Sequence, residues 1–186
     1  MLKNGGCCPW HGGSHTYTLT PRLFTAARDR EFTESCLALG VKPQNILISP
    51  LRGPDGGLTK EQARRIMLHA IQGLPAREVA VTVTAPMPEH GQNPDHTAVG
   101  QAAKELFTEG AFGALTLLHE FIFLPPDLTL TAPGVLLPSA EELSRIQKAA
   151  ACYRRWAPEH GRYAVVYHSV FDEFNSFLSR PLCVSL

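Results

Sequence analysis

Short apolar runs alternate along this chain with segments that carry helix start and stop signals, and this alternation limits the fold more than any other feature. Residues 46–48, 79–84 and 115–124 are continuous enough to be strands buried on both faces. Helical periodicity fills the intervals between them. Because strands that alternate with helices favour a mostly parallel sheet covered by helices, the pattern predicts an α/β fold. The expected architecture is a three-layer α/β/α sandwich with a Rossmann-like sheet.

Capping residues mark the starts of the expected helices. They are Thr20 with Pro21, Thr59 with Gln62, Asn93 with Pro94, and Ser139 with Glu142. The first helix is expected to close at Gly40. Residues 1–19 show no apolar period and are expected to form a loop or a ragged end. In the tail, residues 163–166 are expected to form a strand and residues 171–178 a short helix.

Length and composition favour one compact domain spanning residues 1–186, because 186 residues suffice for a single core. Seventeen basic and seventeen acidic side chains balance, and no dense basic cluster occurs, so nucleic acid is not an expected partner. No apolar run reaches the roughly 20 residues that a membrane-spanning helix needs. The five cysteines follow no secretory signal, which favours a reducing cytoplasm. Cys7 and Cys8 are adjacent and lack the C-x-x-C spacing of a metal site.

The first helix carries an arginine on its expected apolar face. Phe24, Phe32, Cys36 and Leu39 recur at helical spacing, and Arg28 lies four residues from each phenylalanine. Judged from the residues alone, the favoured interpretation is a side chain whose stem covers the core while its head pairs with an acidic neighbour or solvent. A role in a binding crevice is the alternative.

Polar residues gather where the second expected strand ends. In parallel α/β sheets, ligands bind beyond the carboxyl ends of the strands, which here means the loop 85–92 and the helix start Asn93-Pro94-Asp95-His96. A first-turn histidine can serve as a neutral metal ligand, and Asp95 can orient a neighbouring group. Spacing alone favours helix capping or a packed polar pair over a metal site.

Several segments in consistent order are similar to one known family. Asn93-Pro94-Asp95-His96, followed by small residues and Gly100, resembles the second motif of the PIG-L/LmbE family of zinc-dependent de-N-acetylases, which reads His-Pro-Asp-His after a strand. Arg28, Glu31 and Leu39-Gly40-Val41 are similar to an upstream pattern of that family. Gly12-Gly13-Ser14-His15 and Pro54-Asp55-Gly56 resemble two of its loops. The resemblance covers residues 12 to about 110.

This resemblance implies a zinc-dependent hydrolase that removes the acetyl group from an N-acetyl amino sugar or glycoconjugate. It implies that His96 is a zinc ligand and that Arg28 and Asn93 contact the substrate. Asn93 replaces the family's histidine and can donate a hydrogen bond but cannot shuttle a proton near neutral pH.

The family's first motif, His-Pro-Asp-Asp, supplies two further zinc ligands and the general base, and no such run occurs in this sequence. A catalytic zinc usually needs three protein ligands, so the domain is expected to be N-terminally incomplete and inactive unless that motif is supplied. The alternative is a non-catalytic sugar- or partner-binding module derived from the same fold. A homo-oligomer is a further expectation, because a missing central strand would leave an open sheet edge.

Overall fold

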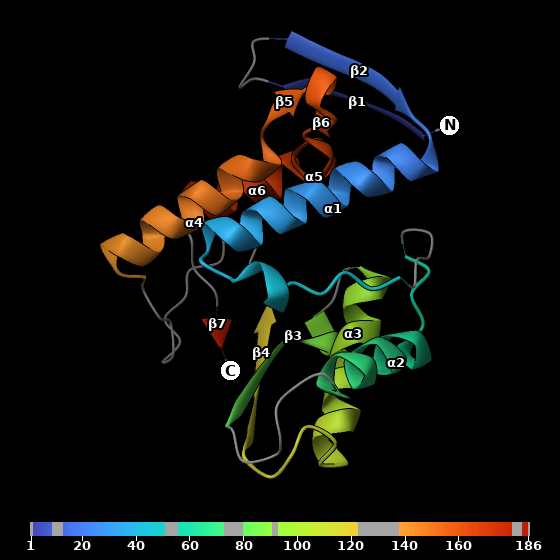
Figure 1. Ribbon diagram of the computed structural model, residues 1–186, viewed down its shortest axis with the longest axis vertical. Coiled ribbons are helices and arrows are strands. Elements are labelled where there is room, and N and C mark those ends of the chain that lie inside the picture. Colours follow the sequence, from blue (N-terminus) through green and yellow to red (C-terminus); the bar gives the residue numbers. More distant parts are fainter. Residues whose placement is uncertain are drawn as a thin grey trace. The chain divides into compact units, whose positions relative to one another are not determined.

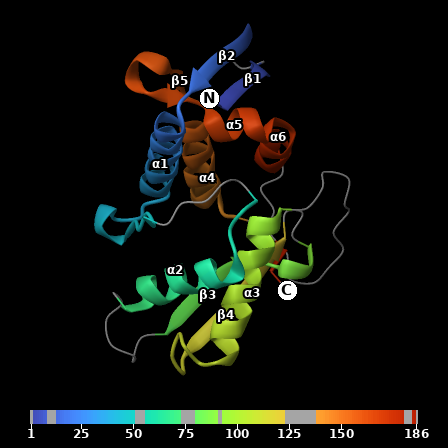
Figure 2. The ribbon, with the colours of Figure 1, turned by 90° about the vertical axis from the view of Figure 1, so that its right-hand side faces the viewer.

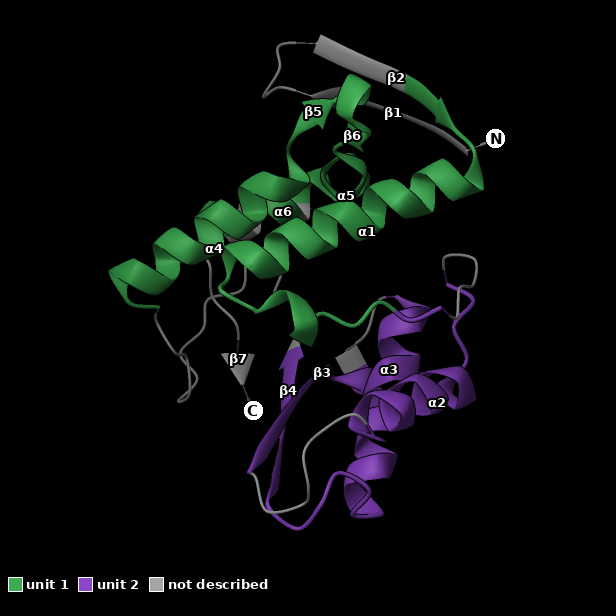
Figure 3. Ribbon diagram, in the orientation of Figure 1, with its two compact units in different colours: residues 1–48, 125–127, 137–182 green, residues 49–124, 128–136, 183–186 purple. Residues whose placement is uncertain are grey.

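The computed structural model describes residues 2–8, 13–50, 56–72, 80–90, 93–122, 138–179 and 184–185 (Figure 1). The expected turn at 54–55, the end of the apolar run at 123–124 and the connection 125–137 lie outside these residues, as do the side chains of Cys7, Cys8 and His15. The chain forms two compact units, which are described separately (Figure 3). Unit 1 comprises residues 1–48, 125–127 and 137–182; unit 2 comprises residues 49–124, 128–136 and 183–186.

Unit 1 combines a hairpin with paired helices. Strands β1 (Leu2–Cys8) and β2 (Gly13–Leu19) pair antiparallel, and the long helices α1 (Pro21–Ala38) and α4 (Ala140–Tyr153) pack side by side (Figures 1 and 2). The remaining elements are η2 (Pro43–Asn45), β5 (Trp156–Ala157), η4 (Pro158–His160), β6 (Arg162–Tyr163), α5 (Val165–Ser169) and α6 (Phe171–Ser179). Segments from both ends of the sequence therefore build one unit.

The core of unit 1 forms where the hairpin meets α1 and α5. Tyr17, Leu19, Ala27 and Val165 are buried together, and Trp156 packs against them. The ring of Tyr17 lies 5.4 Å from that of Trp156, between centroids. Aromatic pairs of this kind add stabilisation beyond the area that they bury. The expectation of a loop over residues 1–19 was therefore wrong, because the alternation of buried Tyr17 and Leu19 with exposed Thr18 is that of a half-buried strand.

Helix α1 begins as expected and packs through a different face. Thr20 caps it by accepting the Leu23 N–H at 3.3 Å, and Gly40 follows its end with φ +92°. Its buried residues are Ala27, Glu31 and Ser35. Of the expected face of Phe24, Phe32, Cys36 and Leu39, Phe24 packs against the core, whereas Phe32 and Leu39 are exposed. The small residues on either side of Glu31 allow closer packing than a face of phenylalanines would.

Unit 2 contains a parallel strand pair joined by a helix. Its elements are α2 (Lys60–Gln72), β3 (Val81–Pro86), η3 (Pro88–His90), α3 (Pro94–Thr108), β4 (Thr116–Ile122) and β7 (Val184–Ser185). Strands β3 and β4 run parallel with Val81 opposite Thr116, and β7 pairs antiparallel with β4. Helix α3 is the crossover between β3 and β4, as Figure 1 shows. The chain is thus mixed helix and strand with a small parallel sheet, which is compatible with the expected α/β class.

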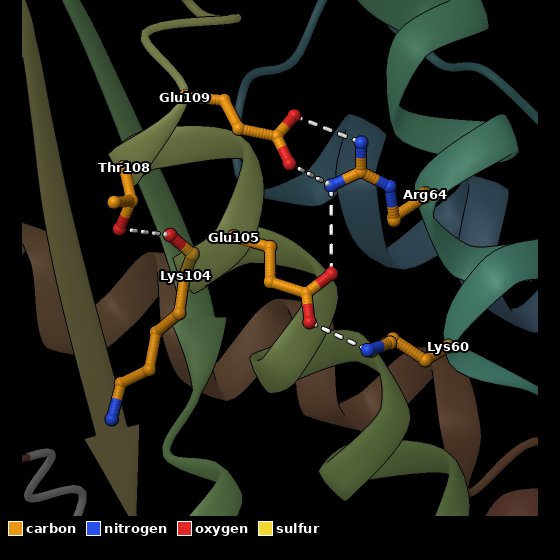
Figure 4. A network of polar contacts seen from close by, with 6 residues as sticks. All are labelled: Lys60, Arg64, Lys104, Glu105, Thr108 and Glu109. Atoms are coloured by element: carbon orange, nitrogen blue, oxygen red, sulfur yellow. Dashed lines mark hydrogen bonds and ion pairs between the residues drawn. The ribbon is translucent and has the colours of Figure 1, made fainter.

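A polar network joins the two helices of unit 2 (Figure 4). Lys60 and Arg64 of α2 both contact Glu105 of α3, and Arg64 also forms a two-pronged ion pair with Glu109. Exposed ion pairs of this kind contribute at most about 1 kcal/mol each. Their main effect is to fix which turns of α2 and α3 lie opposite one another.

Two strand predictions were wrong. Residues 46–48 form no strand, and Leu47 is 65% exposed. Residues 163–166 divide between the end of β6 and the start of α5, with Ala164 at φ +47° between them. The short helix expected at 171–178 is confirmed as α6. Within the described ranges, no helix is long and apolar enough to cross a membrane.

Candidate functional site

The segment of residues 93–96 lies where the sequence predicted, at the start of a helix that follows a strand. Asn93 is the N-cap of α3, and its Oδ1 accepts the Asp95 N–H at 2.8 Å. Pro94 occupies the first helical turn, where a missing N–H has no cost. Both capping boxes expected elsewhere, at Thr59 with Gln62 and at Ser139 with Glu142, are also confirmed. The local sequence therefore determines where helix α3 begins and places residues 93–96 at its start.

Helix α3 lies unusually close to the end of β3 because Gly100 has no side chain. A Cβ atom at position 100 would lie 2.2 Å from the carbonyl oxygen of Pro86 and 2.8 Å from Cδ of Pro88. Real Cβ atoms do not approach backbone oxygens so closely. The glycine thus permits the contact between helix and strand that holds the 93–96 segment at the carboxyl end of β3.

Asp95 connects the start of α3 to the loop before α2. Its two carboxylate oxygens accept the backbone N–H groups of Gly56 at 3.0 Å and Leu58 at 2.8 Å. Hydrogen bonds to a charged acceptor are stronger than those to a neutral one. Asp95 therefore orders residues 56–58, which follow Pro54-Asp55 in sequence.

Replacing Asp95 should loosen this loop. In Asp95→Ala, both backbone N–H groups lose their acceptor, and we expect unit 2 to lose about 1–3 kcal/mol of stability. Amide hydrogen exchange at Gly56 and Leu58 should accelerate more than exchange elsewhere in unit 2. Asp172→Ala, at an exposed position of α6, serves as the control and should leave both amides unchanged. Unaltered protection of Gly56 and Leu58 in Asp95→Ala would show that the carboxylate does not hold the loop.

His96 lies exposed in the first turn of α3. A structural zinc site takes four protein ligands and a catalytic one three. Among the residues that the structure describes, no group of three or more His, Cys, Asp or Glu side chains is arranged to hold a metal ion. Both oxygens of the neighbouring Asp95 accept backbone hydrogen bonds. The described residues around His96 thus do not make up a zinc site by themselves.

Arg28 belongs to α1 of unit 1, whereas Asn93 and His96 belong to unit 2, so each is described within its own unit. The arginine is exposed, whereas Glu31, one turn further along the helix, is buried.

Glu31 is a buried carboxylate, and the sequence patterns did not indicate that it would be buried. It is 3% exposed, and its oxygens accept the backbone N–H groups of Val165 at 2.7 Å and Val166 at 3.1 Å. Burial raises its pKa above the usual value, while these two hydrogen bonds and the charge of Arg28 act in the opposite direction. The carboxylate therefore caps α5 from within the core. The only sequence signal was the stripe of small residues, Ala27 and Ser35, on either side of it.

Comparisons with known protein families, with curated proteins and with solved structures find no match to this chain.

Proposed function

We propose that this chain is a module related to the PIG-L/LmbE de-N-acetylases, with a three-layer sandwich as its complete fold and a binding site at the carboxyl end of β3. The proposed ligand is an N-acetyl amino sugar or glycoconjugate. The proposed reaction is hydrolysis of its acetamide. Water adds to the carbonyl carbon, the C–N bond breaks, the hydroxyl oxygen remains in acetate, and the nitrogen leaves as an amine after taking up a proton.

One observation carries this proposal. The 93–96 segment follows a parallel strand, opens a helix and is followed by Gly100 in close contact with that strand. This is the context in which the related motif occurs in the family. Asp95 also accepts hydrogen bonds from the N–H groups of Gly56 at 3.0 Å and Leu58 at 2.8 Å, so two segments that resemble the family independently meet at this carboxylate.

Within this proposal, the residues have separate roles. Because the side-chain oxygen of Asn93 caps α3, its amide NH₂ remains as a donor for an acetamide oxygen. Arg28, in unit 1, is a proposed substrate contact on the basis of the resemblance alone. His96 is a zinc ligand, and bound zinc would supply Lewis-acid activation of water. Activity requires ligands beyond the described residues, so the chain is a hydrolase only when these complete the site.

Metal content tests the role of His96. If residues outside the described ranges complete the site, the purified protein should hold about one zinc per chain after dialysis against metal-free buffer, and His96→Ala should lose most of it, measured by elemental analysis. His69→Ala is the matched control, because His69 is also an exposed helical histidine, and it should retain the metal. Equal zinc content in all three proteins would exclude His96 as a ligand. Absence of zinc from all three would overturn the hydrolase proposal and favour a sugar- or partner-binding module.

A further inference from the structure

Strand β3 directs the backbone groups of alternate residues toward β4 and away from it. The Val81 N–H donates to the Leu115 carbonyl at 3.1 Å, and the Met87 N–H donates to the Phe121 carbonyl at 2.8 Å. Backbone groups of successive strand residues alternate between the two sides of a strand, so the odd-numbered residues of β3 face β4. The N–H and C=O groups of Thr82 and Thr84 therefore point to the opposite edge.

Within the described residues, no strand pairs with that edge. The sheet has the order β3-β4-β7, which places β3 at its border, beside β4 in both ribbon views (Figures 1 and 2). Proteins usually block such edges with charged side chains, a bulge or an early proline. Strand β3 has the sequence Val-Thr-Val-Thr-Ala-Pro, with its one proline at the last position and no charge. Among the strands that the structure describes, this edge is thus open to pairing.

We propose that β3 pairs antiparallel with β3 of a second copy of this chain, around a twofold axis at Val83. In this register Thr82 of each copy lies opposite Thr84 of the partner subunit. Each such pair exchanges two N–H···O=C bonds, which gives four bonds across the axis. The two sheets then form one continuous sheet in which β3 is no longer an edge.

Pairing with a second copy satisfies the outward backbone groups of both strands at once. Thr82 and Thr84 lie symmetrically about Val83, so every donor on one copy meets an acceptor on the other. Because β3 carries no formal charge, the twofold pairing brings no like charges together. The exposed side chains that meet are threonines, which form favourable cross-strand pairs.

The pairing register between β3 and β4 shows on which face of the sheet Val83 lies. Val83 pairs with Leu118 and Ala85 with Glu120, and Glu120 contacts Lys104 of α3. Paired residues of neighbouring strands point to the same face, so Val83 lies on the helix-covered face. The two copies of Val83 therefore meet there as a pair without direct hydrogen bonds, in which side chains approach most closely.

A register-specific cross-link tests the proposal. In Val83→Cys, the two introduced thiols would lie opposite one another across the axis, within the Cα separation that a disulfide spans. Mild oxidation should give a dimer linked through position 83 of both copies, identified by peptide mass mapping. Ala85→Cys is the matched control, because position 85 lies opposite position 81 of the partner subunit, and it should give no such link. Equal cross-linking of both variants, or of neither, would overturn the proposed register.

Sedimentation velocity tests the dimer without a cross-link. The unmodified chain should dimerise with rising concentration, and Thr82→Lys should weaken the dimer several-fold, since it replaces both cross-strand threonine pairs and places the two lysines diagonally on one face, about 7–8 Å apart. Thr18→Lys, at an exposed position of β2, should leave the dimer unchanged. Circular dichroism checks that each variant is folded. A monomer at all concentrations, or a dimer that responds to Thr18→Lys and not to Thr82→Lys, would overturn the proposal.

Discussion

Glu31→Ala should destabilise unit 1 more than any other single change in α1. The substitution leaves the N–H groups of Val165 and Val166 without the acceptors that they have at 2.7 and 3.1 Å, and it removes the carboxylate and the Cγ methylene from a buried site. An unsatisfied buried donor costs about 1–3 kcal/mol, and a cavity adds to this, so we expect a loss of about 3–5 kcal/mol. Chemical denaturation followed by tryptophan fluorescence measures it, because Trp156 packs in the same core.

Glu31→Gln separates the hydrogen bonds from the charge. Glutamine keeps one oxygen acceptor and cannot ionise, so we expect it to cost less than the alanine variant. Burial raises the pKa of Glu31 in the folded chain, so its stabilising contribution is fully present below the unfolded pKa and decreases as pH rises through the folded pKa. The advantage of the natural residue over glutamine should therefore be largest near pH 4 and should decrease toward neutral pH. An advantage that grows with pH would mean that the two backbone hydrogen bonds outweigh burial.

Gly100→Ala should disrupt the packing of α3 on β3. The added Cβ would lie 2.2 Å from the Pro86 carbonyl oxygen, which belongs to backbone and cannot rotate away. Overpacking of this kind typically costs about 1–3 kcal/mol, and the gain in helix propensity from glycine to alanine, about 1 kcal/mol, offsets only part of a large clash. We expect a net loss of about 2 kcal/mol in unit 2 and faster amide exchange at Met87, whose N–H bonds to β4 just beyond Pro86.

The control for this prediction is the neighbouring position. Gln101 is exposed on the same helix, so Gln101→Ala should change the stability by less than about 0.5 kcal/mol. If Gly100→Ala were as stable as Gln101→Ala, α3 could shift away from β3 without cost, and the close approach would not be needed to hold the 93–96 segment in place.

Helix starts were predictable because capping is local chemistry. Thr20, Asn93 and Ser139 each bond to an N–H two or three residues further on, so a short stretch of sequence contains both partners. Strands depend on a neighbour that the local sequence does not contain. The apolar run at 46–48 therefore looked like a strand, yet no strand forms there. The opening hairpin was missed because its glycines and cysteines hid the alternation at Tyr17 and Leu19.

The candidate site also has one part that the local sequence predicted and another part that it did not. The placement of His96 and Asn93 in the first turn of a helix after β3 followed from adjacent residues and is confirmed. The bonds from Gly56 and Leu58 to Asp95 join positions 39 and 37 residues apart, and the burial of Glu31 depends on residues 134 and 135 positions away. A sequence shows that such polar groups need partners, but it does not show which distant backbone groups provide them.

Unit 1 is built from segments near both ends of the chain, and this has a consequence for its folding during synthesis on the ribosome. Residues 1–48 emerge first, whereas the residues that complete the same core lie between 137 and 182. The Glu31 carboxylate cannot receive its two hydrogen bonds until Val165 and Val166 have left the exit tunnel, after most of unit 2 has been made. Throughout that interval α1 carries an ionised, hydrated side chain on the face that will become its most buried.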